Sequence, residues 1–224
     1  MNTIFNYQEF IQLSQKGNIS FEKITIPNRT QLIDEEGLTK EHVYLIIDGY
    51  VSTSLSPDSP NIYTILGKGL FVNYYSLLEE NMQKLTFKTI SECVVYKYSF
   101  KDLEYFLSMF PENFGFQFFI MKELTRHSFF KSLLSDCIPA GKLELSFANI
   151  AKFHGTMMVP NSVILPKEIR TKIIAAYSGL SKSSFYKQLA ILTEQGKIEK
   201  VDNCWVIHNK ELYNCVKKRP TITQ

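Results

Sequence analysis

The pattern of apolar and polar residues changes several times along the chain, and each change marks an expected element. Residues 7–16 place Phe10, Ile11 and Leu13 among polar side chains, which predicts a short amphipathic helix. Over 21–98, short runs rich in β-branched and aromatic residues alternate with Gly, Pro and Asp turn signals. The clearest runs are 42–56, 61–72, 84–91 and 92–99. Strands at this spacing indicate a small antiparallel barrel or sandwich.

Helical patterns follow the strand-rich region. Residues 100–110 and 142–153 predict short helices, and 163–169 a strand. Residues 112–134 form the longest helical segment, and their apolar positions cover more than one face. A helix that is apolar on two sides must bury both. One side is expected to cover the strands and the other to meet the same helix of a second subunit in a two-fold dimer. The expected dimer contacts are Phe116, Phe119, Ile120 and Leu124. A central helix buried within a monomer is the alternative.

The stretch 171–207 has the pattern of two helices followed by a hairpin. Tyr177 and the two isoleucines before it give the first helix a buried face, and Gly179 can adopt the positive φ of a tight turn. Ser181 then stands where an N-cap is needed. The inward positions of the second helix are Phe185, Leu189 and Leu192. Two strands, 197–201 and 204–208, flank a turn at Asp202-Asn203, which predicts a wing.

This winged helix-turn-helix pattern leaves a polar face for double-stranded DNA. No acidic residue lies between Ser181 and Ile191, as expected of a helix whose N-terminal end enters the major groove. The candidate readers of base edges are Ser183, Tyr186 and Lys187. The candidate phosphate contacts are Ser181, Lys182 and Ser184 on the helix and Lys197 and Lys200 on the wing.

Charge supports this division of the chain. The formal net charge is +3, but residues 138–224 carry 13 Lys and Arg against 6 Asp and Glu, whereas residues 1–137 carry 12 against 16. A basic part joined to an acidic part suggests that only one of them meets a polyanion. The N-terminus lacks the pattern of a signal peptide, and no apolar run is long enough to span a bilayer, so we expect a cytoplasmic protein without a membrane partner.

Candidate chemistry is sparse. The cysteines Cys93, Cys137, Cys204 and Cys215 form no CxxC pair, which argues against a structural zinc or iron–sulfur site, and a thiol-linked role for one of them stays open. The four histidines are scattered over separate elements, so a metal oxygenase on a small barrel is a weak alternative. We therefore expect no enzyme, metal or cofactor. A second alternative is an effector-binding or protein-binding module in which the helix-turn-helix serves only packing.

The order of parts resembles the Crp/Fnr transcription regulators over nearly the whole chain. Residues 42–51 (HVYLIIDGYV) are similar to a strand pair of that family, and 90–111 to the segment that ends its β-roll. Residues 173–199 match its helix-turn-helix pattern, and the overall texture looks most like the PrfA-like branch. The resemblance implies an α+β fold with a jelly-roll-like antiparallel β-roll (1–111), a long dimerisation helix and hinge (112–137) and a winged helix-turn-helix domain (138–224). It further implies a homodimer on a near-palindromic operator, with RNA polymerase as another partner.

Departures from the family pattern fall on the nucleotide site. Val72-Asn73 and Gln83-Lys84 stand where cyclic-nucleotide binders carry a Gly-Glu and an Arg-Ser pair. The acidic ribose ligand and the bidentate guanidinium are missing, so we expect no control by cAMP. A pocket at the position of the family's nucleotide site could serve another small-molecule effector of unknown identity. It would be lined by Asn73, Tyr74, Tyr75, Lys84 and Phe129. The usual Arg-Glu…Arg set of the recognition helix becomes Lys182-Ser183…Lys187, so the half-site sequence need not be the family's commonest one.

Overall fold

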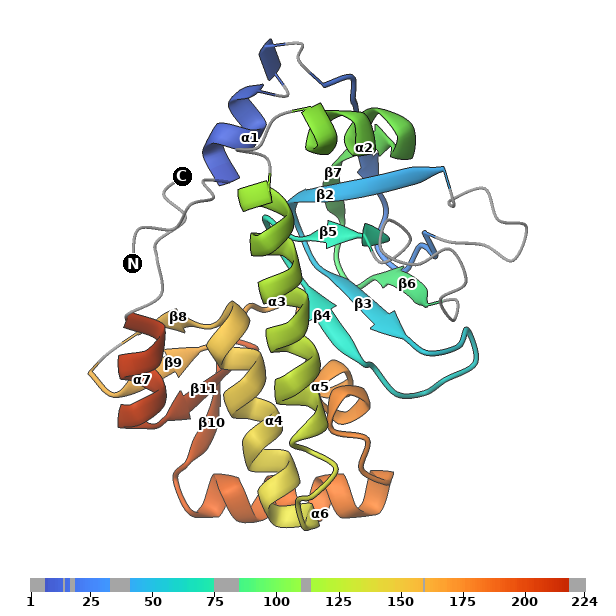
Figure 1. Ribbon diagram of the computed structural model, residues 1–224. Helices are drawn as coiled ribbons and strands as arrows, with labels where there is room; N and C mark the ends of the chain where they lie inside the picture. Colours follow the sequence, from blue (N-terminus) through green and yellow to red (C-terminus); the bar gives the residue numbers. More distant parts are fainter. Residues whose placement is uncertain are drawn as a thin grey trace. The chain divides into compact units, whose positions relative to one another are not determined.

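The computed structural model describes residues 7–13, 15–16, 19–32, 41–74, 85–109, 114–158 and 160–217. The chain divides into two compact units. Unit 1 contains residues 1–58 and 64–127, and unit 2 contains residues 59–63 and 128–224 (Figure 1). The division therefore falls inside the long helix, and a five-residue loop of the strand region belongs with the C-terminal unit. Each unit is described by itself below.

Unit 1 is built on two antiparallel sheets. The strands are β1 (Glu22–Ile26), β2 (His42–Asp48), β3 (Val51–Ser54), β4 (Thr64–Leu66), β5 (Phe71–Val72), β6 (Thr86–Thr89) and β7 (Cys93–Ser99). One sheet has the order β1-β7-β2-β5 and the other β4-β3-β6. Gly49, with a φ of 92°, turns the chain from β2 to β3, and a Cβ there would lie 2.3 Å from the carbonyl oxygen of Glu92. The predicted antiparallel sandwich is confirmed.

The alternation of side chains along β2 divides the core of unit 1 into two layers. Successive residues of a strand point to opposite faces. Val43 and Leu45 pack with helical residues on the outer face of the larger sheet, whereas Tyr44 and Ile46 pack between the two sheets. All four are buried because both faces of this strand are covered.

Three helices cover the outer face of the larger sheet. They are α1 (Tyr7–Leu13), α2 (Phe100–Met109) and the first part of α3 (Phe114–Ser132). Phe10 of α1 is the centre of this layer, with ring contacts to Phe71, Tyr98, Phe106 and Phe116 at centroid distances of 5.2–6.0 Å. Edge-to-face arrangements of this kind stabilise beyond the area they bury.

Unit 2 combines the end of α3 with four further helices and one sheet. The helices are α4 (Pro139–His154), α5 (Thr171–Ser178), α6 (Lys182–Glu194) and α7 (Lys210–Lys217). The strands are β8 (Thr156–Met157), β9 (Ser162–Ile164), β10 (Ile198–Val201) and β11 (Cys204–His208), in the order β10-β11-β9-β8. Figure 1 shows α4 alongside this sheet and α6 across the end of α4.

Two expected boundaries in unit 2 are wrong. The sequence predicts a helix from 142, but α4 begins at Pro139 because proline suits the first turn, where its missing N–H is not needed. The strand expected over 163–169 is only β9, and Leu165 makes a single further bond to the carbonyl oxygen of Trp205 at 2.8 Å.

Candidate nucleic-acid interface

A tight turn joins α5 to α6. Gly179 has a φ of 66°, and its N–H donates to the carbonyl oxygen of Ala175 at 3.2 Å. Ser181 is the N-cap of α6, because its Oγ accepts a hydrogen bond from the backbone N–H of Ser184 at 3.3 Å. The predicted turn and cap are confirmed, and together they fix where α6 starts.

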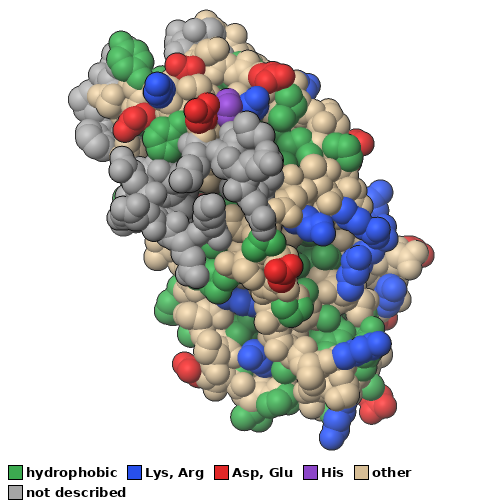
Figure 2. Space-filling model, turned by 90° about the vertical axis from the view of Figure 1, so that its right-hand side faces the viewer, with side chains coloured by type: hydrophobic (Ala, Val, Ile, Leu, Met, Phe, Trp, Pro, Cys, Tyr) green, Lys and Arg blue, Asp and Glu red, His purple; other side chains and the backbone are tan. Residues whose placement is uncertain are grey.

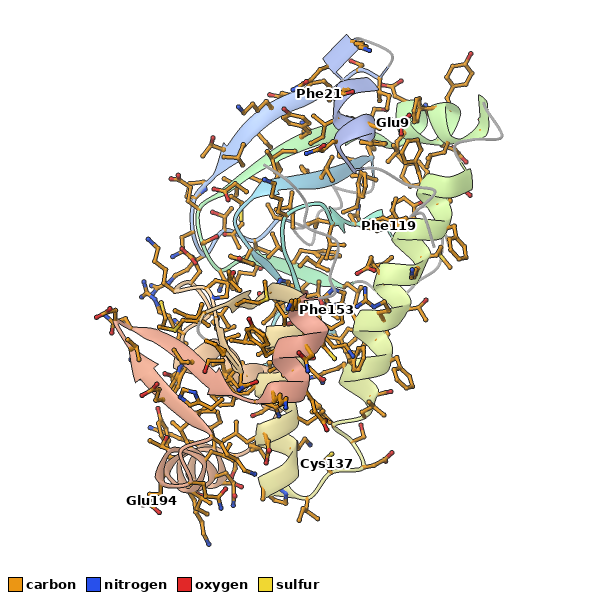
Figure 3. The ribbon with its side chains drawn as sticks, turned by 90° about the vertical axis from the view of Figure 1, so that its left-hand side faces the viewer. Glu9, Phe21, Phe119, Cys137, Phe153 and Glu194 are labelled. Atoms are coloured by element: carbon orange, nitrogen blue, oxygen red, sulfur yellow. The ribbon has the colours of Figure 1, made fainter. Side chains whose placement is uncertain are left out.

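The inward face of α6 anchors the helix in unit 2. Phe185 and Leu192 are buried, as the i, i+7 spacing predicts, whereas Leu189 between them is half-buried. The helix packs on α4 and on β10. In Figure 3, Glu194 marks its C-terminal end.

The outward face of α6 carries the predicted set. Lys182, Ser183, Tyr186 and Lys187 are all exposed, and Tyr186 is 53% exposed despite its large ring. The first turn of the helix holds no acidic residue, so its N-terminal N–H groups and the two ammonium groups make one positive end. At the bottom of Figure 2, the level at which Figure 1 draws α6, side chains coloured as Lys or Arg stand at the surface beside hydrophobic and acidic ones.

The hairpin after α6 is held near its turn by an indole ring. Asp202 and Asn203 have φ values of 46° and 66°, the positive pair that a two-residue type I′ turn requires. The Nε1–H of Trp205 donates to the Oγ1 of Thr171 at 3.3 Å, and its ring meets Phe147 of α4 edge-on at 5.5 Å. The hairpin is therefore fixed to the start of α5 and to the core of unit 2.

The two lysines expected to touch phosphate from the hairpin differ. Lys200 is exposed on β10. The ammonium of Lys197 lies 2.7 Å from a carboxylate oxygen of Glu144 on α4. A phosphate contact by Lys197 would have to replace that ion pair, so Lys200 is the stronger candidate of the two.

The end of α5 is capped by donors that the sequence analysis missed. The last carbonyl groups of a helix need partners from outside it. The backbone N–H of Ile62 donates to the carbonyl oxygen of Ala176 at 3.0 Å, and the ammonium of Lys131 donates to that of Tyr177. The same ammonium lies 4.3 Å from the centre of the Tyr177 ring. In the sequence, Ile62 stands out as an apolar residue within a polar turn and Lys131 as a charged residue within an apolar helix. These two exceptions were the available signs of a contact.

Tyr177 is further tied into unit 2 by its own surroundings. Burial raises its pKa to about 12, against the opposing effect of a hydrogen bond with Asn149. Asn149 donates from Nδ2 to the carbonyl oxygen of Phe130 at 2.8 Å. The end of α3, the middle of α4 and the end of α5 therefore form one connected polar network beneath the turn.

The expected effector pocket of unit 1 is only partly within the described residues. Tyr75 and Lys84 lie outside them. Asn73 is buried with a φ of 67°, and its Nδ2 donates to the carbonyl oxygen of His42 at 2.9 Å. Tyr74 is 2% exposed in the core, where burial raises its pKa to about 12. Phe129 is 57% exposed and belongs to unit 2, so its place in this pocket stays a prediction.

The structure also corrects the predicted dimer contacts. Phe116, Ile120 and Leu124 are buried in the core of unit 1, and Phe119 packs against the same cluster half-buried. These four residues face their own chain. The opposite face of α3 presents exposed apolar side chains at Phe118, Met121 and Phe129, which are 67%, 42% and 57% exposed. The prediction that α3 is apolar on two sides is confirmed, but the four residues expected to meet a second subunit lie on the side that packs against their own chain.

The cysteines and the possible metal ligands form no further site in the described residues. Burial raises the pKa of the Cys93 thiol, and Cys137 lies half-buried in the turn between α3 and α4 (Figure 3). Within the described ranges, no three His, Cys, Asp or Glu side chains are grouped to hold a metal ion. No helix in those ranges has the length and apolar character to cross a membrane.

Comparison with known proteins gives a fold but no close relative. No protein-family model matches the sequence, and no curated protein matches it. Among solved structures, a cyclic nucleotide-binding domain containing protein from Listeria monocytogenes EGD-e is similar with a TM-score of 0.75 and 17% identity, covering 92% of this chain and 96% of that one.

Two named regulators share the same fold. The c-di-GMP responsive global regulator CLP of Xanthomonas campestris has a TM-score of 0.69 at 18% identity, over 89% of this chain and 99% of its own. A transcriptional regulator of the CRP family from Thermus thermophilus, TTHB099, has a TM-score of 0.63 at 14% identity, over 89% of this chain and 100% of its own. The chain therefore has the α+β fold of the CRP-type regulators along almost its full length.

Proposed function

We propose that this protein is a sequence-specific DNA-binding transcription regulator of the Crp/Fnr type. The observation that carries the proposal is the N-terminal half of α6, where Lys182, Ser183, Tyr186 and Lys187 stand exposed at a helix end free of acidic residues. In this proposal α5, α6 and the β10–β11 hairpin form a winged helix-turn-helix. The CRP-type fold of the chain supports it.

We propose a homodimer as the working form. The exposed apolar stripe of Phe118, Met121 and Phe129 on α3 is the face for the second copy. Two recognition helices related by two-fold symmetry would read half-sites about one helical turn apart on a near-palindromic operator. A cytoplasmic location and RNA polymerase as a further partner belong to the same proposal, and the PrfA-like branch stays a prediction.

Control by cAMP is not part of the proposal. Asn73 stands where the acidic ribose ligand is expected, and its side-chain amide is already bonded to the carbonyl oxygen of His42. Calorimetric titration of the protein with cAMP is expected to give no saturable heat, and saturable binding would contradict this part.

Selection of bound duplexes from a random pool, followed by affinity measurement across salt concentrations, tests the central claim. The affinity should fall steeply with salt because phosphate contacts release counterions. The Lys182→Ala/Lys187→Ala double variant should lose binding. Lys217→Ala, which removes another exposed charge at the end of α7, is the control and should not. Binding that ignores salt, or none to any duplex, would leave the packing-only alternative.

A further inference from the structure

A pocket lies entirely within unit 2, beneath the α5–α6 turn. Its volume is about 390 Å³, which falls in the range of small-molecule sites. Four separate stretches of chain line it: the loop 59–63, the end of α3 with the turn after it, the first turn of α4 and the end of α5. The lining residues are Asn61, Tyr63, Lys131, Ser132, Leu134, Ser135, Lys142, Ser178 and Gly179.

The charge of this pocket is one-sided. Lys131 and Lys142 both line it, and the described lining residues include no carboxylate. The pKa of Lys131 is lowered to about 8, first by burial and then by the charge of Lys142. Two like charges in a half-enclosed space repel each other, and an anion between them would relieve both the repulsion and the desolvation.

The pocket also offers neutral donors beside the two ammonium groups. The hydroxyl of Ser132 is already used, because it donates to the carbonyl oxygen of Phe129 at 2.8 Å. The hydroxyl of Ser178 likewise donates to the carbonyl oxygen of Ala175. The side-chain amide of Asn61 and the hydroxyl of Ser135 line the same pocket and can add hydrogen bonds to an anion.

We propose that this pocket binds a small organic anion of the carboxylate or phosphomonoester class between Lys131 and Lys142, and that the anion acts as an effector of the DNA-reading face. The second clause rests on the proposed function. Both anion classes accept charge-assisted hydrogen bonds from ammonium groups.

The route from the pocket to the DNA-reading face is short. Lys131 donates to the carbonyl oxygen of Tyr177, two residues before the glycine of the turn. An anion that draws this ammonium toward itself weakens the cap of α5. The turn that positions α6 begins directly after that cap, so a change at the cap reaches α6. A ligand shifts the equilibrium between two arrangements only as far as it binds them differently.

Titration of the full-length protein with citrate and with glycerol 3-phosphate, at constant ionic strength set by chloride, tests the site. We expect saturable heat by calorimetry and shifts of the Gly179 and Asn61 amide signals by NMR. Lys142→Met should lower the affinity for both anions roughly tenfold or more. Lys172→Met, which removes an exposed lysine of α5 outside the pocket, should leave the affinity unchanged.

Lys131→Met should abolish binding of both anions. If loss of the α5 cap unfolds Lys131→Met, the result for Lys142→Met decides the test alone. No saturable binding of either anion would overturn the site, and so would binding that Lys142→Met and Lys172→Met weaken equally. That result would leave Lys131 as a cap for α5 and nothing more.

A second measurement tests the effector role apart from the site. The affinity for the selected duplex is measured with and without glycerol 3-phosphate, in the native protein and in Lys142→Met. A change of at least roughly threefold in the native protein alone is expected for a modest coupling. An unchanged affinity would overturn the effector role. If the protein binds no DNA at all, the proposed function fails, whereas the anion titration still decides the site.

Discussion

The N-terminal half of α6 and the residues around Asn73 both set polar side chains beside an apolar core. On α6 these side chains point to the surface, whereas around Asn73 they point into the protein. On α6, Lys182, Ser183 and Lys187 are exposed, and the helix is anchored from its other side. In unit 1, Asn73 turns its amide onto the carbonyl oxygen of His42, and Tyr74 is buried in the core.

The difference lies in where each region makes its hydrogen bonds. Side chains that remain exposed can bind a partner without being replaced in the core, whereas buried ones must first be released. Substitutions on α6 should therefore change binding and spare folding, and substitutions at the buried positions should do the reverse. The following predictions test this contrast, from the largest expected effect to the smallest.

Tyr74→Ala should cost about 3–5 kcal/mol of the free energy of unfolding, because it empties a buried aromatic position. Chemical denaturation followed by circular dichroism measures the loss. Tyr105→Ala removes a ring of the same size that is 66% exposed and is the control. Equal stability of the two variants would show that the Tyr74 ring is not part of the core.

Phe118→Asp should convert the proposed dimer into monomers and reduce affinity for a two-half-site duplex by roughly 100-fold or more, since each subunit then binds alone. The side chain is 67% exposed on α3, so the fold should survive. Sedimentation and gel-shift titration report the two effects. Leu55→Asp, at a position 52% exposed in unit 1, should alter neither. A variant that stays dimeric would exclude this face.

Lys187→Ala should cost about 1–3 kcal/mol on the selected duplex and much less on random DNA, because a base contact carries sequence preference. The ratio of the two affinities is the measurement. An equal loss on both duplexes would assign Lys187 to phosphate instead.

The affinity of the unit 2 pocket for sulfate, an anion that does not titrate over this range, should fall as pH rises from about 7 to about 9. Lys131 is charged below its pKa of about 8 and neutral above it, so up to about a tenfold loss is expected. Lys142 and Tyr63 line the same pocket, and the Tyr177 ring lies against the Lys131 ammonium. The Tyr177 pKa of about 12 keeps its hydroxyl neutral over this range.

In Lys131→Met any sulfate binding that remains should show a flatter profile, as followed by calorimetry at each pH. An unchanged slope in this variant would mean that another group controls the pH dependence.

Ser181→Ala should lower the free energy of unfolding by about 1 kcal/mol, since the Oγ that accepts from the N–H of Ser184 is lost. Ser181 belongs to both sides of the comparison, because it caps α6 and borders the exposed face that is proposed to bind DNA. Thermal unfolding measures the first role, with Ser181→Asn, another good cap, as the control. A variant as stable as the native protein would show that the cap contributes little.

Much of the fold follows from local pattern. The continuous apolar run of β2 and the turn at Gly49 define a strand pair without tertiary information. The i, i+7 spacing of Phe185 and Leu192 likewise fixes the inward side of α6 and, by exclusion, its outward side. The start of α4 was expected at residue 142, three residues too late, whereas proline at 139 is a favourable first residue of a helix.

Other features depend on contacts that no local pattern contains. Both sides of α3 are apolar, so the side that meets the sheet is decided by the rotation of the helix. Phe116, expected at a dimer contact, is buried in the core of unit 1 instead. The cap on α5 joins Lys131 to Tyr177, 46 residues apart. The pocket beneath it combines four stretches of chain, and composition alone does not bring them together.

The cap on α5 has a consequence for anyone who would transplant the proposed DNA-binding helices. Ile62 and Lys131 supply donors to the last carbonyl groups of that helix, yet both precede residue 138 in the chain. A fragment cut at 138 would leave two carbonyl groups without those donors at the turn that aims α6. The part that can be transferred to another protein is therefore not one continuous stretch. A chimaera that keeps α5 capped and α6 in place must include the loop 59–63 and the end of α3.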